Sequence, residues 1–141
     1  MKQDRSGVAR RNKSLEEIVQ RAPGFGCEGE VGKFISAYLC AEVFATKLID
    51  FYRSDRRLEG KGLQVDVLTS AAKYFGMSID GLMLRELFCG GEGKRGAKSA
   101  RQLRNGYLHT LSQEDRKEIL SSSGVLTFQL YQFMRCRIIT M

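Results

Sequence analysis

The chain has 141 residues, of which 43% are hydrophobic and 28% charged, and a formal net charge of +7. This length fits a single domain with a substantial core. The excess of Lys and Arg over Asp and Glu favours polyanionic partners, because each neutralised phosphate releases counterions. The four cysteines contain no CxxC pair, and a single histidine cannot complete a typical zinc site. We therefore expect free thiols and neither a metal nor another cofactor.

The beginning of the chain lacks the features of a targeting signal. It is charged and has no apolar core of the kind found in signal peptides. No run approaches the ~20 apolar residues that a membrane span needs. We predict a cytoplasmic protein without membrane contact, in which residues 1–13 form a flexible basic N-terminal arm and residues 14–141 form one helical domain.

The first predicted helix is short. Ser14 and Glu17 have the spacing of a capping box, which predicts a helix that ends near residue 21. The loop predicted over 23–32 contains the GxGxxG spacing of dinucleotide-binding proteins at residues 24–29. That motif requires a preceding strand, and a helix is predicted there instead, so we reject a dinucleotide site.

Three helices are predicted in the middle of the chain. A long one over 31–56 carries apolar residues at helical spacing, a second begins near Val65 and stops at Gly76, and a short apolar one covers 79–88. Residues 71–85 also resemble a helix-turn-helix, but the second helix has few polar side chains that could read DNA bases. Burial in the core or in an interface is the preferred interpretation of this segment.

The last third of the chain begins with a glycine-rich loop over 89–98. Its positive residues, which we expect to attract a polyanion, are Lys94, Arg95 and Lys98. Helices are predicted downstream over 99–111, about 112–120 and 125–139, the last two separated by a turn at 121–124. No strand pair is evident. The predicted fold is therefore all-α, an up-and-down helical bundle of about four main helices plus short accessory helices.

The helix over 99–111 has two distinct faces. At about 100° per residue, Leu103 and Tyr107 fall on one apolar stripe. The roughly opposite stripe is polar and contains Arg101, Asn105 and His109, with Arg104 at the border between the two. A lone histidine is usually structural, but a core histidine would lie on the apolar stripe. We therefore expect His109 to face solvent, a partner or a ligand.

These residues suggest a family. An all-helical domain of this size with the pattern Arg-Asn-x-x-x-His late in the chain resembles the HEPN superfamily, and Arg104, Asn105 and His109 match its signature position by position. The resemblance implies a metal-independent endoribonuclease that acts as a homodimer. It also implies the toxin of a toxin–antitoxin or phage-defence system, with a nucleotidyltransferase-like antitoxin as partner.

Metal-free RNA cleavage fits these residue types. The 2′-OH attacks the adjacent phosphorus, which requires a proton acceptor, a proton donor for the leaving 5′ oxygen and positive charge for the transition state. His109 can carry out either proton transfer near neutrality, Arg104 can clamp phosphate oxygens, and Asn105 can orient the ring or hold a phosphate. Because the chain has one histidine for two proton transfers, a two-fold dimer would supply the second. The residues expected to contact RNA are Arg101, Lys94, Arg95 and Lys98.

Two other functions stay open from the sequence. One is a non-catalytic helical module that binds a nucleotide or RNA, for which the loss of His109 would matter little. The other is a DNA-binding regulator that uses residues 65–88, which would need an affinity for duplex DNA that does not depend on His109.

Overall fold

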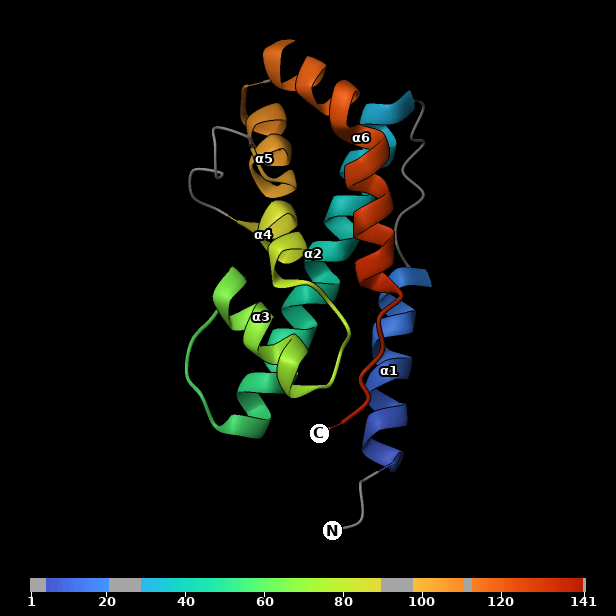
Figure 1. Cartoon of the computed structure of the whole chain (residues 1–141), viewed down its shortest axis with the longest axis vertical. Helices are drawn as coiled ribbons and strands as arrows, with labels where there is room; N and C mark the ends of the chain where they lie inside the picture. Colours follow the sequence, from blue (N-terminus) through green and yellow to red (C-terminus); the bar gives the residue numbers. More distant parts are fainter. Residues whose placement is uncertain (1–4, 21–28, 90–97, 111–112, 141) are drawn as a thin grey trace.

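The computed structural model describes residues 5–20, 29–89, 98–110 and 113–140, and these residues contain six α-helices and no strand (Figure 1). The helices are α1 (Arg5–Gln20), α2 (Gly29–Arg56), α3 (Val65–Tyr74), α4 (Gly81–Phe88), α5 (Ala100–Thr110) and α6 (Gln113–Met134). The predicted all-α helical bundle is confirmed. None of the helices in these ranges is long and apolar enough to cross a membrane.

Helix α2 is the centre of the bundle. It packs against α1, α3, α5 and α6 and runs along the length of the molecule (Figure 1). Most of the apolar positions predicted over 31–56 are buried, among them Phe34, Tyr38 and Leu48, while Ile35 and Tyr52 are partly buried. Phe44 is buried as well. Burial on several faces is what a central helix requires, because neighbouring helices cover it from different sides.

The turn that ends α2 is exposed to solvent, apart from the buried side chain of Arg53. Leu58 donates its N–H to the carbonyl of Arg53 at 2.8 Å, and Arg57 adopts a φ of 53°, which closes the helix with a Schellman-type turn. Arg53 is only 7% exposed and donates to the carbonyl of Gly62 at 3.3 Å. Its guanidinium also lies so close to Gly60 that a Cβ there would stand 3.2 Å from it.

The first helix corrects the prediction for the N-terminal residues. Helix α1 begins at Arg5, so residues 5–13 are helical and do not form a flexible arm, and Ser14 lies inside the helix where a cap was predicted. Arg11 and Asn12 are both turned toward the bundle: Arg11 pairs with Asp55, and Asn12 exchanges hydrogen bonds with the backbone of Ile138. Because these inward positions are polar, the sequence lacks the apolar residues at helical spacing from which a helix is predicted.

The last helix corrects a second prediction. The turn predicted at residues 121–124 and the two flanking helices are one continuous helix, α6, which bends along its length (Figure 1). Its buried residues remain in phase across that segment, from Ile119 to Leu126 and Leu130, and this burial outweighs the weak helix propensity of Ser and Gly. Ser121 donates to the carbonyl of Glu118 at 2.9 Å, a contact that helps a helix bend.

The C-terminal residues correct a third prediction. A helix was predicted through residue 139, but the residues after 135 are extended. Helix α6 ends at Met134, and Ile139 and Thr140 both donate their N–H groups to the carbonyl of Phe75, at 2.8 and 3.1 Å. Together with the bonds between Asn12 and Ile138, they fasten the tail between α1 and the end of α3 (Figure 1).

Candidate functional site

The helix that carries the Arg-Asn-x-x-x-His pattern is fixed at its first turn. Ser99 and Gln102 form a capping box: Gln102 donates its N–H to Ser99 Oγ at 3.1 Å, and Ser99 donates its N–H to Gln102 Oε1 at 2.9 Å. Ser99 Oγ also donates to the carbonyl of Cys89 at 2.5 Å, which ties α5 to the end of α4. The helix was predicted to begin at residue 99, and the Ser-x-x-Gln spacing in the sequence is a further signal for that start.

Arg104 and Asn105 form one unit on α5. Arg104 donates from Nη1 to Asn105 Oδ1 at 2.7 Å, and its guanidinium carbon lies 6.0 Å from the centroid of the Tyr38 ring. The Nε atom of Arg104 is buried and has no hydrogen-bond partner among the described residues. The amide of Asn105 therefore holds the guanidinium of Arg104 in a defined orientation. The guanidinium still has N–H groups that can donate to a ligand.

Tyr38, on α2, forms the base of this site. Its side chain is fully buried, and its hydroxyl makes no hydrogen bond of normal geometry within the described parts of the chain. Burial raises the pKa of Tyr38 well above its usual value, and the carboxylate of Glu42 raises this pKa further. Arg101 and Arg104 act in the opposite direction, so two arginines and one carboxylate surround this phenol.

Sequence reasoning missed Tyr38 and Glu42 as members of the site. Tyr38 was assigned to the apolar face of α2, where it does lie, and Glu42 was not considered. A usable signal was present, because an acidic residue one turn after a tyrosine lies next to it on a helix. What could not be read from the sequence is that α5 packs against this part of α2.

Arg101 and Lys98, which were both predicted to contact RNA, lie in and just before the first turn of α5. Arg101 was predicted to face RNA, but its Nη1 donates to the carbonyls of Leu63 and Phe88, at 3.0 and 3.5 Å. It connects α5 to the residues before α3 and to the end of α4, a role in the fold. Lys98 is exposed just before α5.

The remaining predicted residues lie partly or wholly outside the described residues. Lys94 and Arg95 are outside, and so is the side chain of His109. The backbone of residue 109 belongs to α5 and stands about 7.5 Å further along the helix axis than that of residue 104. The described part of the site therefore consists of four residues: Arg104, Asn105, Tyr38 and Glu42.

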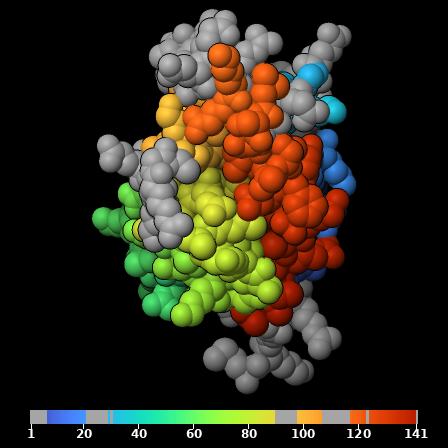
Figure 2. Space-filling model, turned by 45° about the horizontal axis from the view of Figure 1, so that its top comes forward, coloured from blue at the N-terminus to red at the C-terminus, as the bar shows by residue number. Residues whose placement is uncertain are grey.

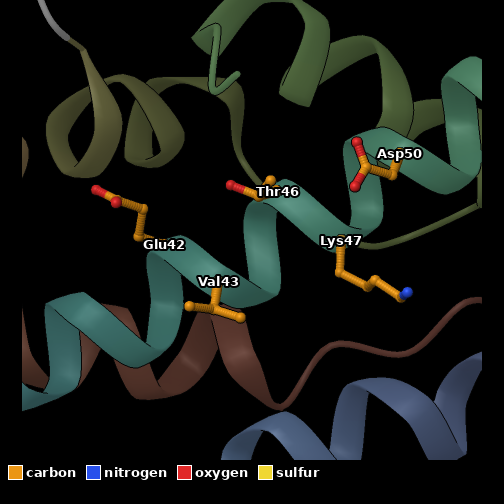
Figure 3. A pocket seen from close by; sticks show the side chains of 5 residues that line it. All are labelled: Glu42, Val43, Thr46, Lys47 and Asp50. Carbon is orange, nitrogen blue, oxygen red and sulfur yellow. The ribbon is translucent and has the colours of Figure 1, made fainter. Parts of the chain in front are cut away.

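A shallow hollow on α2 begins at Glu42 (Figure 3). Its lining residues all come from that helix and are Glu42, Val43, Thr46, Lys47 and Asp50. Glu42 is therefore reached from solvent on this side, whereas Tyr38 is not. The mixture of two carboxylates and one ammonium along a single helix is typical of a solvated face.

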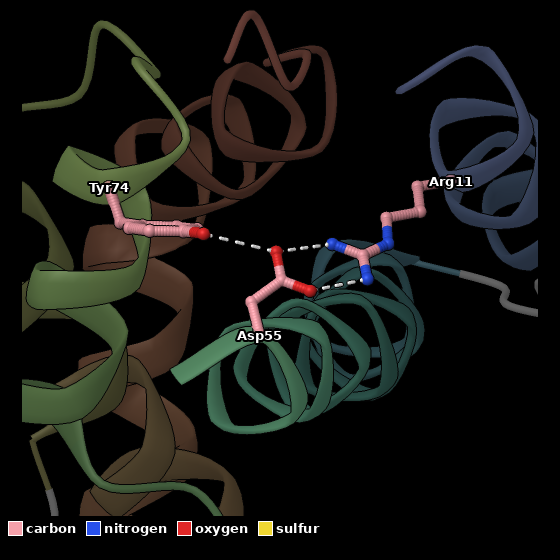
Figure 4. Close-up of polar contacts among 3 residues, drawn as sticks. All are labelled: Arg11, Asp55 and Tyr74. Carbon is pink, nitrogen blue, oxygen red and sulfur yellow. Dashed lines mark hydrogen bonds and ion pairs between the residues drawn. The ribbon is translucent and has the colours of Figure 1, made fainter. Parts of the chain in front are cut away.

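A second polar cluster joins three helices and is structural (Figure 4). Arg11 of α1 donates to both oxygens of Asp55 of α2, at 2.8 and 2.7 Å, and the hydroxyl of Tyr74 of α3 lies 3.3 Å from the same carboxylate. These contacts lower the pKa of Asp55, with the hydrogen bonds from Arg11 as the largest cause. Since Asp55 is engaged by both neighbours, the cluster serves to hold helices together.

The cysteines are not arranged for metal binding in the part of the chain that the structure covers. Cys40, Cys89 and Cys136 are free thiols, and no group of three or more His, Cys, Asp or Glu side chains lies together there. Burial raises the pKa of Cys40 and of Cys136, which keeps both as thiols near neutral pH. Cys27 lies outside the described residues.

The chain matches no family described by a sequence profile, no curated protein and no solved structure. The assignment of a function therefore depends on the residues and geometry of the chain itself.

Proposed function

We propose that the protein is a metal-independent endoribonuclease that acts as a homodimer, with Arg104, His109 and Asn105 as its catalytic residues. The observation that carries the proposal is the Arg104–Asn105 pair, in which a half-buried guanidinium is oriented by an amide 2.7 Å away. The net charge of +7 supports an RNA substrate. The resemblance to the HEPN superfamily, carried by the same residues, supports the reaction.

Each residue has a defined task in the proposed reaction. The guanidinium of Arg104 stabilises the negative charge that grows on the phosphate oxygens in the transition state. His109 accepts the proton of the 2′-OH or donates one to the leaving 5′ oxygen, because its ordinary pKa lies near neutrality. Asn105 keeps Arg104 from changing its orientation when the substrate binds, which avoids a reorganisation cost during the reaction.

The proposal includes a dimer because one chain lacks a second histidine. A two-fold axis near α5 would bring two Arg104 and two His109 into one cleft, so that one histidine acts as base and the other as acid. A cytoplasmic location and a neutralising antitoxin partner belong to the same proposal and are supported by the family resemblance alone.

The test is cleavage of an end-labelled RNA of mixed sequence in the presence of EDTA. We expect the wild type to cleave and to leave 2′,3′-cyclic phosphate ends, and His109→Ala and Arg104→Ala to lose this activity while keeping their unfolding temperature. The matched control is Arg85→Ala, which removes one positive charge at an exposed site 3.7 Å from Asp66 and should retain activity. Equal cleavage by wild type and His109→Ala would contradict the proposal, and RNA binding without cleavage would point to a non-catalytic binding module.

A further inference from the structure

A carboxylate lies beside the site that is proposed to bind a phosphate. Glu42 stands one turn after Tyr38 on α2, and the guanidinium of Arg104 lies 6.0 Å from the ring of the same tyrosine. Among the described residues Glu42 forms no ion pair, although Arg101 and Arg104 are both close enough to act on Tyr38. A carboxylate at this place repels the phosphate backbone, so it favours RNA binding only if it accepts hydrogen bonds from another part of the RNA.

The carboxylate of Glu42 is open to solvent on one side of α2. The middle of α2 is covered on the face formed by α4 (yellow) and α6 (orange to red), which Figure 2 shows. The shallow hollow that begins at Glu42 provides the access. Glu42 and Thr46 point to the same side of α2 there (Figure 3), and Val43, which is 54% exposed, adds an apolar surface. A carboxylate, a hydroxyl and an apolar surface are the groups that bind the edge and the face of a nucleobase.

Guanine is the RNA base that matches a carboxylate best. Its Watson–Crick edge presents two adjacent donors, N1–H and the N2 amino group, followed by the acceptor O6, and the two oxygens of a carboxylate can accept both donors. Adenine and cytosine each present one amino donor beside a ring nitrogen that is an acceptor, and uracil presents one donor between two carbonyls. The hydroxyl of Thr46, one turn after Glu42, can donate to O6.

We propose that Glu42 and Thr46 bind the base of a guanine nucleotide next to the phosphate held by Arg104, with Val43 against the face of the base. This inference rests on the proposed function, since it names the base that the same site recognises. Helices α2 and α5 run in opposite directions (Figure 1), so Glu42, which is about 6 Å further along α2 than Tyr38, lies toward the beginning of α5. Residue 109 lies toward the other end of α5, so the guanine does not occupy the place of the proton transfers.

The experiment measures binding of three fluorescent single-stranded hexanucleotides to the full chain by anisotropy. Every sugar lacks the 2′-OH, so that no cleavage can occur. The first strand has one guanine among adenines, the second has hypoxanthine in its place, which lacks the N2 amino group, and the third has adenine only. We expect the guanine strand to bind at least about tenfold more tightly than the adenine strand, and the hypoxanthine strand to lie between them. Equal binding of the guanine and adenine strands, or no binding of any strand, would overturn the proposal.

Variants separate hydrogen bonding from charge. Glu42→Gln removes the negative charge and one of the two acceptor oxygens, so it should abolish the preference for guanine while the adenine strand binds as well as before or more tightly. The matched control is Asp50→Asn, which makes the same change of charge at an exposed position about two turns further along α2 and should keep the preference. If Glu42→Gln raised the affinity for all three strands by the same factor, Glu42 would act through its charge alone and the proposal would be wrong.

Binding and cleavage distinguish this inference from the proposed function. A guanine preference that depends on Glu42, without cleavage of RNA in EDTA, would support the base site and refute the ribonuclease. Cleavage without regard to guanine would refute the base site and leave the ribonuclease in place. If both proposals hold, the wild type should cleave mixed-sequence RNA next to guanine, and Glu42→Gln should lose this bias.

Discussion

At the scale of single residues, the proposed role of Arg104 in binding phosphate oxygens depends on its geometry as much as on its charge. Arg104 lies between the ring of Tyr38 and the amide of Asn105, which fixes the plane of the guanidinium. A lysine would keep the positive charge, but it has no planar guanidinium with several N–H donors. It could not reproduce the geometry of the hydrogen bond to Asn105 Oδ1.

We therefore expect Arg104→Lys to lower the rate of RNA cleavage by about 10²-fold, a loss comparable to the removal of one transition-state donor. Initial rates at saturating RNA measure this effect. Asn105→Ala should cause a smaller loss in the same direction, because the guanidinium would remain but would no longer be oriented. A fully active Arg104→Lys variant would show that only the charge at this position matters.

Tyr38 gives a prediction about stability. Its hydroxyl is buried and has no hydrogen-bond partner of normal geometry among the described residues, although the carboxylate of Glu42 lies nearby, and a buried unpaired hydroxyl costs about 1–3 kcal/mol of desolvation free energy. We expect Tyr38→Phe to leave the free energy of unfolding unchanged or to raise it by up to about 1 kcal/mol, as measured by urea unfolding at pH 8. A marked loss of stability would mean that the hydroxyl has a partner that stabilises the fold.

The pKa of Tyr38 adds a dependence on pH. Since this pKa is raised in the folded chain, the unfolded chain loses the phenolic proton first, so the contribution of Tyr38 to stability falls as the pH rises above about 10. Tyr38→Phe should therefore lose less stability than the wild type between pH 8 and pH 10.5.

At the scale of elements, the joint between α1, α2 and α3 is the Arg11–Asp55–Tyr74 cluster. The pKa of Asp55 is lowered in the folded chain, so its contribution to stability is present above about pH 4 and is lost as the pH falls below that value. Asp55→Asn should lower the free energy of unfolding by about 1–3 kcal/mol at pH 7, and this difference should shrink at pH 3. Urea unfolding at the two pH values measures it.

The matched control for this prediction is Asp66→Asn. The carboxylate of Asp66 is 87% exposed and lies 3.7 Å from Arg85, an arrangement that contributes little to stability. Its replacement should leave the unfolding free energy nearly unchanged at both pH values. If both variants behaved alike, the three-helix cluster would not be the source of the effect.

The elements also show what the sequence could and could not predict. Helices α2 to α5 were predicted nearly to their ends, because their apolar periods are unbroken and Gly76 marks a clear stop. Helix α1 was not, because Arg11 and Asn12 face inward to partners that are 44 and 126 residues away. Helix α6 was divided in two, because local propensity at residues 121–124 opposed a helix that tertiary burial stabilises.

The same division holds for the candidate site. Arg104, Asn105 and His109 follow one another along a single helix, so their pattern could be found in the sequence alone. Tyr38 and Glu42 belong to the site only because α5 packs on α2. The contacts of Arg101 within the chain could not be predicted for a related reason: its partners are the backbone carbonyls of Leu63 and Phe88, which no side-chain pattern reveals.

At the scale of the whole molecule, the proposed activity depends on how many chains form the site. One histidine per chain must serve two proton transfers, so a monomer would hold half of the acid–base pair.

Mixing wild type with inactive His109→Ala distinguishes a composite site from a site within one chain. If each active site needs both histidines, mixed dimers are inactive, and after exchange of subunits an equal mixture should retain about a quarter of the activity of the same total amount of wild type. Independent sites would retain about half. The measurement is the initial rate of RNA cleavage at constant total protein as the fraction of His109→Ala is raised. A quadratic fall supports the shared site, whereas a linear fall would mean that a single chain supplies both proton transfers and that another group of that chain acts beside His109.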